Sequence, residues 1–289
     1  MNTVTKQLSI NNNPLIVHGI STGLVSVKTE FRETNKKGLL AAISFMLDRK
    51  FTEWMPIWTW VIEHPEGIFV IDTGENSGVG DKDYFNSSGL FANWLNTTQF
   101  KFNVRIEDEL NSQLLKIGIP ISRINKVILT HLHLDHIDGL KFFPDIPILV
   151  NKLEWENPYG DLPKLYPNWF EPELIPLQNP FKNFKNTSSL TKADDLIMVE
   201  TPGHTHGHTS ILLKADQGYL LFAGDVVYHQ SQILENKFAG ANVDFRKAKE
   251  TYSSILEFAT NNKLVLLPSH DIDAGRRLQS FDELKINNS

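Results

Sequence analysis

Three histidine-rich segments, residues 130–136, 201–209 and 268–271, each follow directly on a short run of β-forming residues. Together they hold seven of the ten histidines in this 289-residue chain. In an α/β sheet, ligands usually bind at the loops that leave strand ends. We therefore expect a fold that brings the three strand ends, and the histidines after them, to one binding site.

Strand-type and helical patterns alternate along the whole chain. Further β-type runs, rich in branched and aromatic side chains, occupy residues 68–71, 146–150, 211–213 and 219–222. Residues 104–117 and 244–260 place their apolar side chains on one stripe of a helix, and Asp244 is a suitable N-cap for the second. No Gly/Ser linker or change of composition interrupts the alternation. The pattern predicts one α/β domain, residues 1–289, in which sheet is sandwiched by helices.

Two segments look like additions to this core, at about residues 36–56 and 157–190. The first contains a helix candidate at residues 38–50. The second contains six of the 14 prolines, which are spaced too closely for a long regular element. Long irregular segments in a compact domain are often lids or binding loops, and a surface excursion with short helical turns is the alternative. We expect both segments to lie near a substrate pocket.

Composition excludes several classes of protein. Because the chain has no cysteine, a tightly held metal must use histidine and carboxylate ligands. The 28 Lys+Arg against 34 Asp+Glu, a net charge of −6, argue against nucleic acid or anionic lipid as the main partner. The N-terminal residues lack the apolar region of a secretory signal, and the nearly apolar stretch 39–47 is far shorter than the roughly 20 residues that span a bilayer. We expect a cytoplasmic protein with no membrane or nucleic-acid partner.

The segment 130–136 has the composition of a metal site. His131 and His133 are two residues apart, and on extended backbone such side chains project to one side, so both imidazoles can bind one ion. The chain then turns, and Asp135 with His136 is offset toward a second position close by. Imidazole nitrogens and carboxylate oxygens suit zinc or a similar divalent ion.

Later residues complete the predicted ligand set. His208 and His270 each add a nitrogen, and Asp225, after the run 219–222, is the candidate bridging carboxylate. Only one nitrogen is needed from the segment 201–209, and we assign it to His208, which leaves His204 to brace the loop by hydrogen bonding. The remaining histidines are expected to be exposed, to flank the site or to be ordinary structural residues: His206, His18, His64 and His229.

From about Trp58 to about Arg277 the chain resembles the metallo-β-lactamase superfamily. The family pattern is His-x-His-x-Asp-His followed by a Gly-His, an Asp and a further His. It is matched in order by His131, His133, Asp135, His136, His208, Asp225 and His270. The family's Asp-Thr-Gly is also present, and there Asp72 would support the site from behind. The resemblance implies an αββα sandwich with two metal ions between the upper edges of its sheets.

The resemblance also implies a role for each ligand. One metal ion would be held by His131, His133 and His208. The other would be held by Asp135, His136 and His270. Asp225 and a hydroxide would bridge the two ions, and zinc is the expected metal.

Within the superfamily the chain is most similar to the N-acyl homoserine lactone lactonases, the quorum-quenching enzymes. Tyr228 stands three residues after Asp225, as in their Asp-x-x-Tyr, and residues 268–271 and 89–91 resemble their Gly-His-Asp and Gly-Leu-Phe segments. Three positions depart from the usual residues: Leu134 stands in place of Phe, Asp138 in place of Gly, and Ser269 in place of Gly. These departures bear on substrate preference and remove no ligand.

This similarity implies hydrolysis of a lactone ring by attack of the metal-bridging hydroxide, since paired metals supply hydroxide at neutral pH. The Tyr228 hydroxyl and one metal would stabilise the charge that develops on the carbonyl oxygen. Asp135 would act as general acid and deliver a proton to the leaving alkoxide. The expected substrate is an N-acyl homoserine lactone, a small molecule with an apolar tail.

The tail requires an apolar groove, which the two added segments and the loop after the second histidine are expected to supply. The candidate substrate-binding residues are Leu40, Met46, Trp54, Trp58 and Leu134, with ordinary core packing as the alternative. Apolar residues near the N-terminus, residues 15–20, either pack on the chain's own sheet or on a partner, which leaves a homodimer open.

Other functions share this ligand pattern. A thioesterase or a phosphotriesterase of the same superfamily would use the same metal site. A diiron redox module and a noncatalytic metal-binding module belong to different classes. The diiron branch has Glu where this chain has His133, and the full ligand set together with Tyr228 argues against a noncatalytic module.

Overall fold

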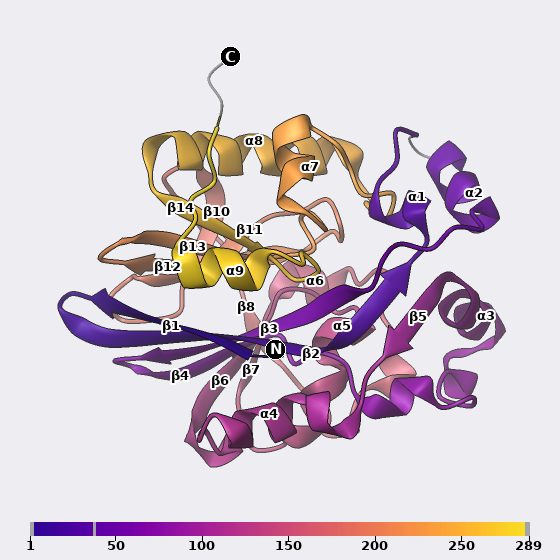
Figure 1. Ribbon diagram of the computed structural model, residues 1–289, viewed down its shortest axis with the longest axis horizontal. Helices are drawn as coiled ribbons and strands as arrows, with labels where there is room; N and C mark the ends of the chain where they lie inside the picture. Colours follow the sequence, from indigo (N-terminus) through magenta and orange to yellow (C-terminus); the bar gives the residue numbers. More distant parts are fainter. Residues whose placement is uncertain (1–2, 37–38, 287–289) are drawn as a thin grey trace.

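Two β-sheets stacked face to face form the centre of the molecule, with helices on both outer faces (Figure 1). The computed structural model describes residues 3–36 and 39–286. In Figure 1, α8 (Phe245–Asn261) lies above the sheets and α4 (Leu110–Lys116) lies below them. This is the αββα sandwich that the resemblance implies.

The first sheet has eight strands within the described residues, in the order β1-β2-β3-β4-β6-β7-β8, with β5 paired to the end of β2. The pairs from β4 to β8 are parallel, and the others are antiparallel. Its strands are β1 (Thr3–Ile10), β2 (Asn13–Val27), β3 (Met55–His64), β4 (Gly67–Ile71), β5 (Phe100–Asn103), β6 (Ile124–Leu129), β7 (Ile148–Asn151) and β8 (Glu173–Ile175).

The second sheet has six strands in the described part of the chain, in the order β14-β13-β12-β11-β10-β9. Only β13 and β14 pair in parallel among the strand pairs of this sheet that the structure describes. The strands are β9 (Asn179–Phe181), β10 (Phe184–Ser189), β11 (Leu196–Glu200), β12 (Thr209–Ala215), β13 (Gly218–Gly224) and β14 (Leu264–Pro268).

Alternating side chains explain why each sheet is covered on both faces. In β3, Trp60 and Ile62 point into the cluster between the sheets, whereas Val61 points into the cluster under α4. Successive side chains of a strand face opposite sides, so strands this apolar must bury both faces. Trp60 meets Phe222 of the other sheet with ring centroids 5.4 Å apart, which joins the two sheets through the core.

The long outer helices bury one apolar stripe each. In α8, Tyr252, Ile255 and Phe258 pack on the second sheet, and the Asp244 side chain accepts hydrogen bonds from the backbone N–H groups of Arg246 and Lys247. This confirms the predicted N-cap. The other helices are α1 (Thr29–Arg32), α2 (Leu39–Leu47), α3 (Leu90–Gln99), α5 (Leu134–Ile137), α6 (Lys152–Glu156), α7 (Gln230–Glu235) and α9 (Ala274–Ser280).

The helix predicted over residues 104–117 is shorter than expected. A 3-10 turn, Ile106–Asp108, is separated from α4 by Glu109, whose ψ of 145° lies outside the helical range and breaks the hydrogen-bond ladder. The predicted helix at residues 38–50 ends at Leu47, and Gly38 lies outside the described residues.

Segment 157–190 contains no long element, as its prolines predict, but it adds β8 to the first sheet and β9 and β10 to the second. It therefore serves partly as sheet edge. Near the N-terminus, Leu15, Val17 and Ile20 are fully buried in the chain's own core, so they pack on their own sheet. Among the described helices, none combines the length and the apolar character needed to cross a bilayer.

Candidate metal centre

Loops from both sheets bring the predicted ligands together at one edge of the sandwich. The loop after β6 carries His131 and His133, and the loop after β11 carries His204. Asp225 follows β13 and His270 follows β14. The three histidine-rich segments therefore meet, as their positions after strands predict.

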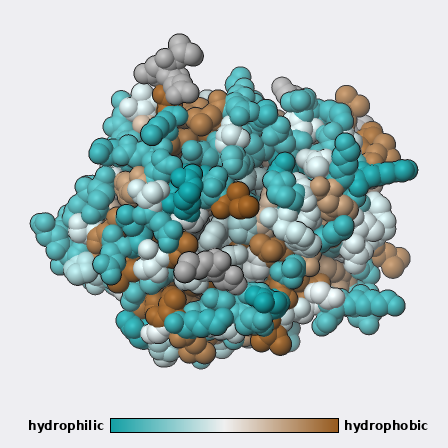
Figure 2. All heavy atoms as spheres, in the orientation of Figure 1, coloured by the Kyte–Doolittle hydropathy of each residue, from teal (hydrophilic) through white to brown (hydrophobic). Residues whose placement is uncertain are grey.

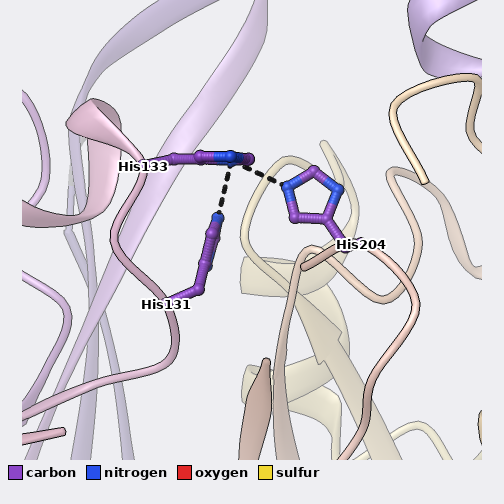
Figure 3. A group of neighbouring side chains, drawn as sticks. All are labelled: His131, His133 and His204. Atoms are coloured by element: carbon purple, nitrogen blue, oxygen red, sulfur yellow. Dashed lines mark hydrogen bonds between the residues drawn. The ribbon is translucent and has the colours of Figure 1, made fainter. Parts of the chain in front are cut away.

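Three imidazole nitrogens converge at the first position (Figure 3). Nδ1 of His133 lies 3.1 Å from Nε2 of His131 and 2.9 Å from Nε2 of His204. The other nitrogen of His133 donates to the Tyr159 carbonyl oxygen at 2.9 Å, so Nδ1 presents a lone pair to its neighbours. Burial lowers the pKa of all three imidazoles, which keeps them neutral. Converging lone pairs on neutral nitrogens are stable together when a cation lies between them.

The structure corrects the assignment of His208. Its Nε2 accepts a hydrogen bond from the Asp225 N–H at 3.1 Å, and its Nδ1 donates to the Thr201 carbonyl oxygen at 3.1 Å. Burial lowers the pKa of His208 to about 3, so the ring is neutral and both nitrogens are used within the protein. His204, which was expected to brace the loop, takes its place beside His131 and His133.

A second group lies next to the first. Nε2 of His270 lies 3.3 Å from Oδ2 of Asp135 and 3.4 Å from Oδ1 of Asp225. Nε2 of His136 lies 3.3 Å from the same Asp225 oxygen. The other oxygen of Asp225, Oδ2, lies 3.6 Å from Nε2 of His204, so Asp225 lies between the two groups of ligands, where a bridging carboxylate would be.

Charge and hydrogen bonding at the second position also fit a cation. Burial acts to lower the pKa of His270, but the carboxylates of Asp225 and Asp135 outweigh it and raise the value to about 10. Nε2 of His136 and Oδ1 of Asp225 are buried with no hydrogen-bond partner in the described chain. Buried polar atoms without partners are rare, and a metal ion commonly accounts for them. The nitrogen and carboxylate donors present here are those that zinc prefers, so the residues fit two divalent metal ions.

Groups behind the histidines fix the orientation of the rings. Asp72, which has a positive φ of 57°, accepts hydrogen bonds from the Thr130 N–H at 2.8 Å and from Nδ1 of His136 at 2.8 Å. Nδ1 of His270 donates to the Pro56 carbonyl oxygen at 3.0 Å. Such contacts set the tautomer and leave Nε2 of each ring facing the site. Asp72 therefore lies behind the His136 ring, on the side away from Nε2.

Glu154 of α6 ties two of the histidine loops together and was not predicted from the sequence. Its carboxylate accepts hydrogen bonds from the Leu132 N–H at 3.2 Å, the Thr205 hydroxyl at 2.7 Å and the Gly207 N–H at 3.1 Å. Leu132 lies between His131 and His133, and Thr205 follows His204. A single buried side chain thus sets the distance between the loops that form the first position.

Asp138, at the position where the lactonases usually have Gly, forms a buried acidic pair with Glu75. It accepts hydrogen bonds from the Tyr84 hydroxyl, at 2.6 Å to Oδ2, and from the Asn76 amide. Burial, together with the negative charge of Asp138, raises the pKa of Glu75 well above its usual range. Glu75 therefore holds a proton at a pH where an exposed carboxyl is ionised.

Tyr228 lies against the second position. It is 3% exposed, and its ring stacks on His270 with centroids 5.3 Å apart and an interplanar angle of 13°. Burial, and then the negative charge of Asp225, raises the pKa of Tyr228 well above its usual range. The hydroxyl therefore stays protonated and can act as a hydrogen-bond donor.

A cavity of about 480 Å³ opens from the metal-binding groups. His133, Asp135, Tyr228 and His270 form its polar end. Apolar side chains from widely separated elements line the rest, among them Val27, Phe31, Phe45, Phe100, Leu134 and Phe245. A cavity of this size with a polar end fits a small ligand that has an apolar portion.

Four of the five predicted substrate-binding residues do not line this cavity. Leu134 does, but Leu40, Met46 and Trp54 are 68%, 45% and 42% exposed and point away from it. Trp58 is buried between the sheets, stacked on Trp60.

Ala41 and Phe45 of α2, four residues apart on one face of the helix, line the cavity instead, whereas Leu40, Ile43 and Met46 are exposed. Hydrophobic side chains accordingly appear on the surface where Figure 1 places α2 (Figure 2).

The remaining histidines lie as expected. His18 contacts Thr5 and Glu63, and His64 contacts Asp195. His229 caps the N-terminus of α7 by accepting a hydrogen bond from the Ser231 N–H. His206 is exposed and lines the mouth of the cavity.

An αββα sandwich with a histidine and aspartate cluster at the edge of its sheets defines a class of metal-dependent proteins. The family model of the metallo-β-lactamase superfamily matches residues 52–270, most of the chain. The chain therefore belongs to the metallo-β-lactamase superfamily.

Individual relatives point to the group that the sequence resembles. An N-acyl homoserine lactonase of a Bacillus species is 26% identical over 230 residues, which cover 79% of this chain and 86% of the relative. A solved N-acyl homoserine lactone hydrolase with N-hexanoyl-L-homoserine at its catalytic metal centre superposes with a TM-score of 0.72 at 19% identity, covering 94% and 96% of the two chains. The dizinc quorum-quenching lactonase AidC superposes with a TM-score of 0.65 at 16% identity, covering 95% and 92%. The predicted fold and the predicted resemblance are both confirmed.

Proposed function

We propose that this protein is a dinuclear-metal hydrolase that opens the lactone ring of N-acyl homoserine lactones. The observation that carries the proposal is the cavity, which joins two adjoining metal-binding groups and a protonated tyrosine to an apolar interior. Curated relatives named N-acyl homoserine lactonase support the choice of substrate.

The ligand set follows from the contacts. We assign His131, His133 and His204 to one metal ion and Asp135, His136 and His270 to the other, with Asp225 between them. Two divalent ions held there, with zinc as the expected metal, would supply hydroxide at neutral pH and polarise the lactone carbonyl.

The chain's own residues would position the substrate and transfer a proton during ring opening. The Tyr228 hydroxyl, kept protonated by burial, would donate a hydrogen bond to the carbonyl oxygen as negative charge develops on it. Burial acts to raise the pKa of Asp135, but the hydrogen bond to His270 and the charges of His136 and His270 together lower it. The ionised carboxylate could therefore accept the proton of the attacking hydroxide. Asp135 would then return that proton to the ring oxygen as it leaves, which completes the opening of the ring.

The two segments added to the core would shape the site for the acyl chain. Ala41 and Phe45 from the first segment, and Tyr159 and Leu162 from the second, line the cavity. An acyl chain in this cavity would be shielded from water by apolar side chains, which stabilises binding in proportion to the area buried.

A panel of substrates tests the proposal. Purified protein with its metal content measured is assayed for acid release from N-acyl homoserine lactones of increasing chain length, and in parallel with a thioester and a phosphotriester. We expect ring opening to be the fastest reaction and to be abolished in His133→Ala. Protein that holds two metal ions per chain and releases no acid at any chain length would refute the lactonase assignment. Faster hydrolysis of the thioester or the phosphotriester would instead identify the protein as a thioesterase or a phosphotriesterase.

A further inference from the structure

Asn242 is a buried polar residue in the wall of the cavity. Its side chain is 7% exposed, and neither Oδ1 nor Nδ2 makes a hydrogen bond to any described residue. The backbone N–H of Asn242 donates to the Ala239 carbonyl oxygen at 3.3 Å, so its polar main chain is engaged while its amide is not.

Leaving both ends of an amide unpaired in the interior is costly, because the side chain loses its water and gains no partner. An asparagine can form four hydrogen bonds, and an apolar residue of the same size would avoid the loss. Buried polar groups of this kind in a folded protein are exceptional and call for an explanation. A ligand that enters the cavity and pairs with the amide supplies one.

The surroundings single out Asn242. Its sequence neighbours Ala241 and Val243 also line the cavity and are apolar. Asn96 lines the cavity too, but its Nδ2 already donates to the Ala92 carbonyl oxygen at 2.8 Å. Asn242 is therefore the asparagine of the described lining whose side-chain amide has no partner within the protein.

The position of Asn242 is tied to the metal centre through the backbone. Two residues later, the N–H of Asp244 donates to the Gly203 carbonyl oxygen at 3.1 Å, and Gly203 directly precedes His204. Asp244 in turn caps α8. The segment that carries Asn242 is thus fastened both to a ligand loop and to the long outer helix.

We propose that Asn242 recognises a secondary amide of the ligand. The ligand's amide carbonyl oxygen would accept a hydrogen bond from Nδ2; in a planar trans amide the N–H points the opposite way, so the same side chain pairs with the carbonyl alone. The inference rests on the proposed function, because an N-acyl homoserine lactone carries one such amide between its ring and its tail. Asn242 acts as a specificity-determining residue that distinguishes this substrate from a plain alkyl lactone.

The test compares two lactones on two variants. KM and kcat are measured for N-hexanoyl homoserine lactone and for a γ-lactone with an alkyl chain of matched length and no amide, using wild type, Asn242→Leu and the surface control Asn261→Leu. Asn242→Leu is expected to lower kcat/KM for the amide substrate by about tenfold, mainly through KM, since a lost hydrogen bond has that value. For the amide-free lactone the change is expected to stay within about twofold, and Asn261→Leu changes neither.

Thermal stability provides a second readout. Because leucine leaves no polar atom unpaired, Asn242→Leu is expected to melt at or above the wild-type temperature. A variant that loses stability and loses both activities equally shows a structural role and overturns the inference, as does an unchanged KM for the amide substrate. If wild type opens neither lactone, the proposed function itself fails.

Discussion

Replacing Glu154 by alanine tests how the two histidine loops are held together. The substitution removes a buried carboxylate that accepts three hydrogen bonds, from Leu132, Thr205 and Gly207. Hydrogen bonds to a charged group contribute roughly 1.5 to 3 kcal/mol each, and their loss leaves three buried donors unpaired. Burial raises the pKa of Glu154, so desolvation offsets part of that gain. We expect a net loss of about 3 to 5 kcal/mol in the free energy of unfolding.

Thermal unfolding in the presence of a chelator measures this loss without any contribution from metal. For a protein of this size, 1 kcal/mol corresponds to about 2 to 4 °C, so Glu154→Ala is expected to melt roughly 10 °C below wild type. Glu154→Gln keeps one acceptor oxygen and is expected to lie between the two. Metal affinity is expected to fall by about 10- to 100-fold, because the loops that carry the ligands are no longer fixed.

Glu156→Ala is the matched control on the same helix. Glu156 pairs with Lys152 at 3.6 Å, and both side chains are more than half exposed, so its loss is expected to change stability by less than about 0.5 kcal/mol. A Glu154→Ala protein that melts with this control, or that loses stability while binding metal as tightly as wild type, would refute the reasoning.

Three further predictions concern Glu75, His204 and Phe45. Because burial and a neighbouring carboxylate raise the pKa of Glu75, stability is lost as the pH rises through that raised value; Glu75→Gln is expected to gain stability over wild type above about pH 5 in chelator, and a constant difference would contradict this. By elemental analysis, His204→Ala is expected to lose one metal ion per chain, whereas His208→Ala keeps both; the reverse would restore the sequence-based assignment. Phe45→Ala is expected to raise KM for long acyl chains by about tenfold, and the outward-facing Leu40→Ala by less than twofold.

Most of the fold could be predicted from patterns that are local in the sequence. The helical stripe of residues 244–260 and the cap at Asp244 depend on periodicity and backbone chemistry close in sequence, and both are visible without a structure. The meeting of the histidine segments could likewise be predicted, because each segment follows a strand and ligands usually bind at the loops that leave strand ends.

What the sequence could not decide depends on long-range contacts. His204 and His208 are the same residue type in one loop, and only the bonds from His208 to Thr201 and Asp225 show which ring is already used. The apolar helix α2 could present any face, so its inward residues were missed. Glu154 and Asn242 carry no local pattern, because their roles arise from residues distant in sequence.

The most direct test of the dinuclear centre titrates chelator-stripped protein with zinc and follows ring opening of N-hexanoyl homoserine lactone by acid release. We predict that activity rises with metal content and reaches its maximum near two ions per chain, with the ring-opened acid as the product. Protein that binds two ions per chain and leaves the lactone intact would contradict the account.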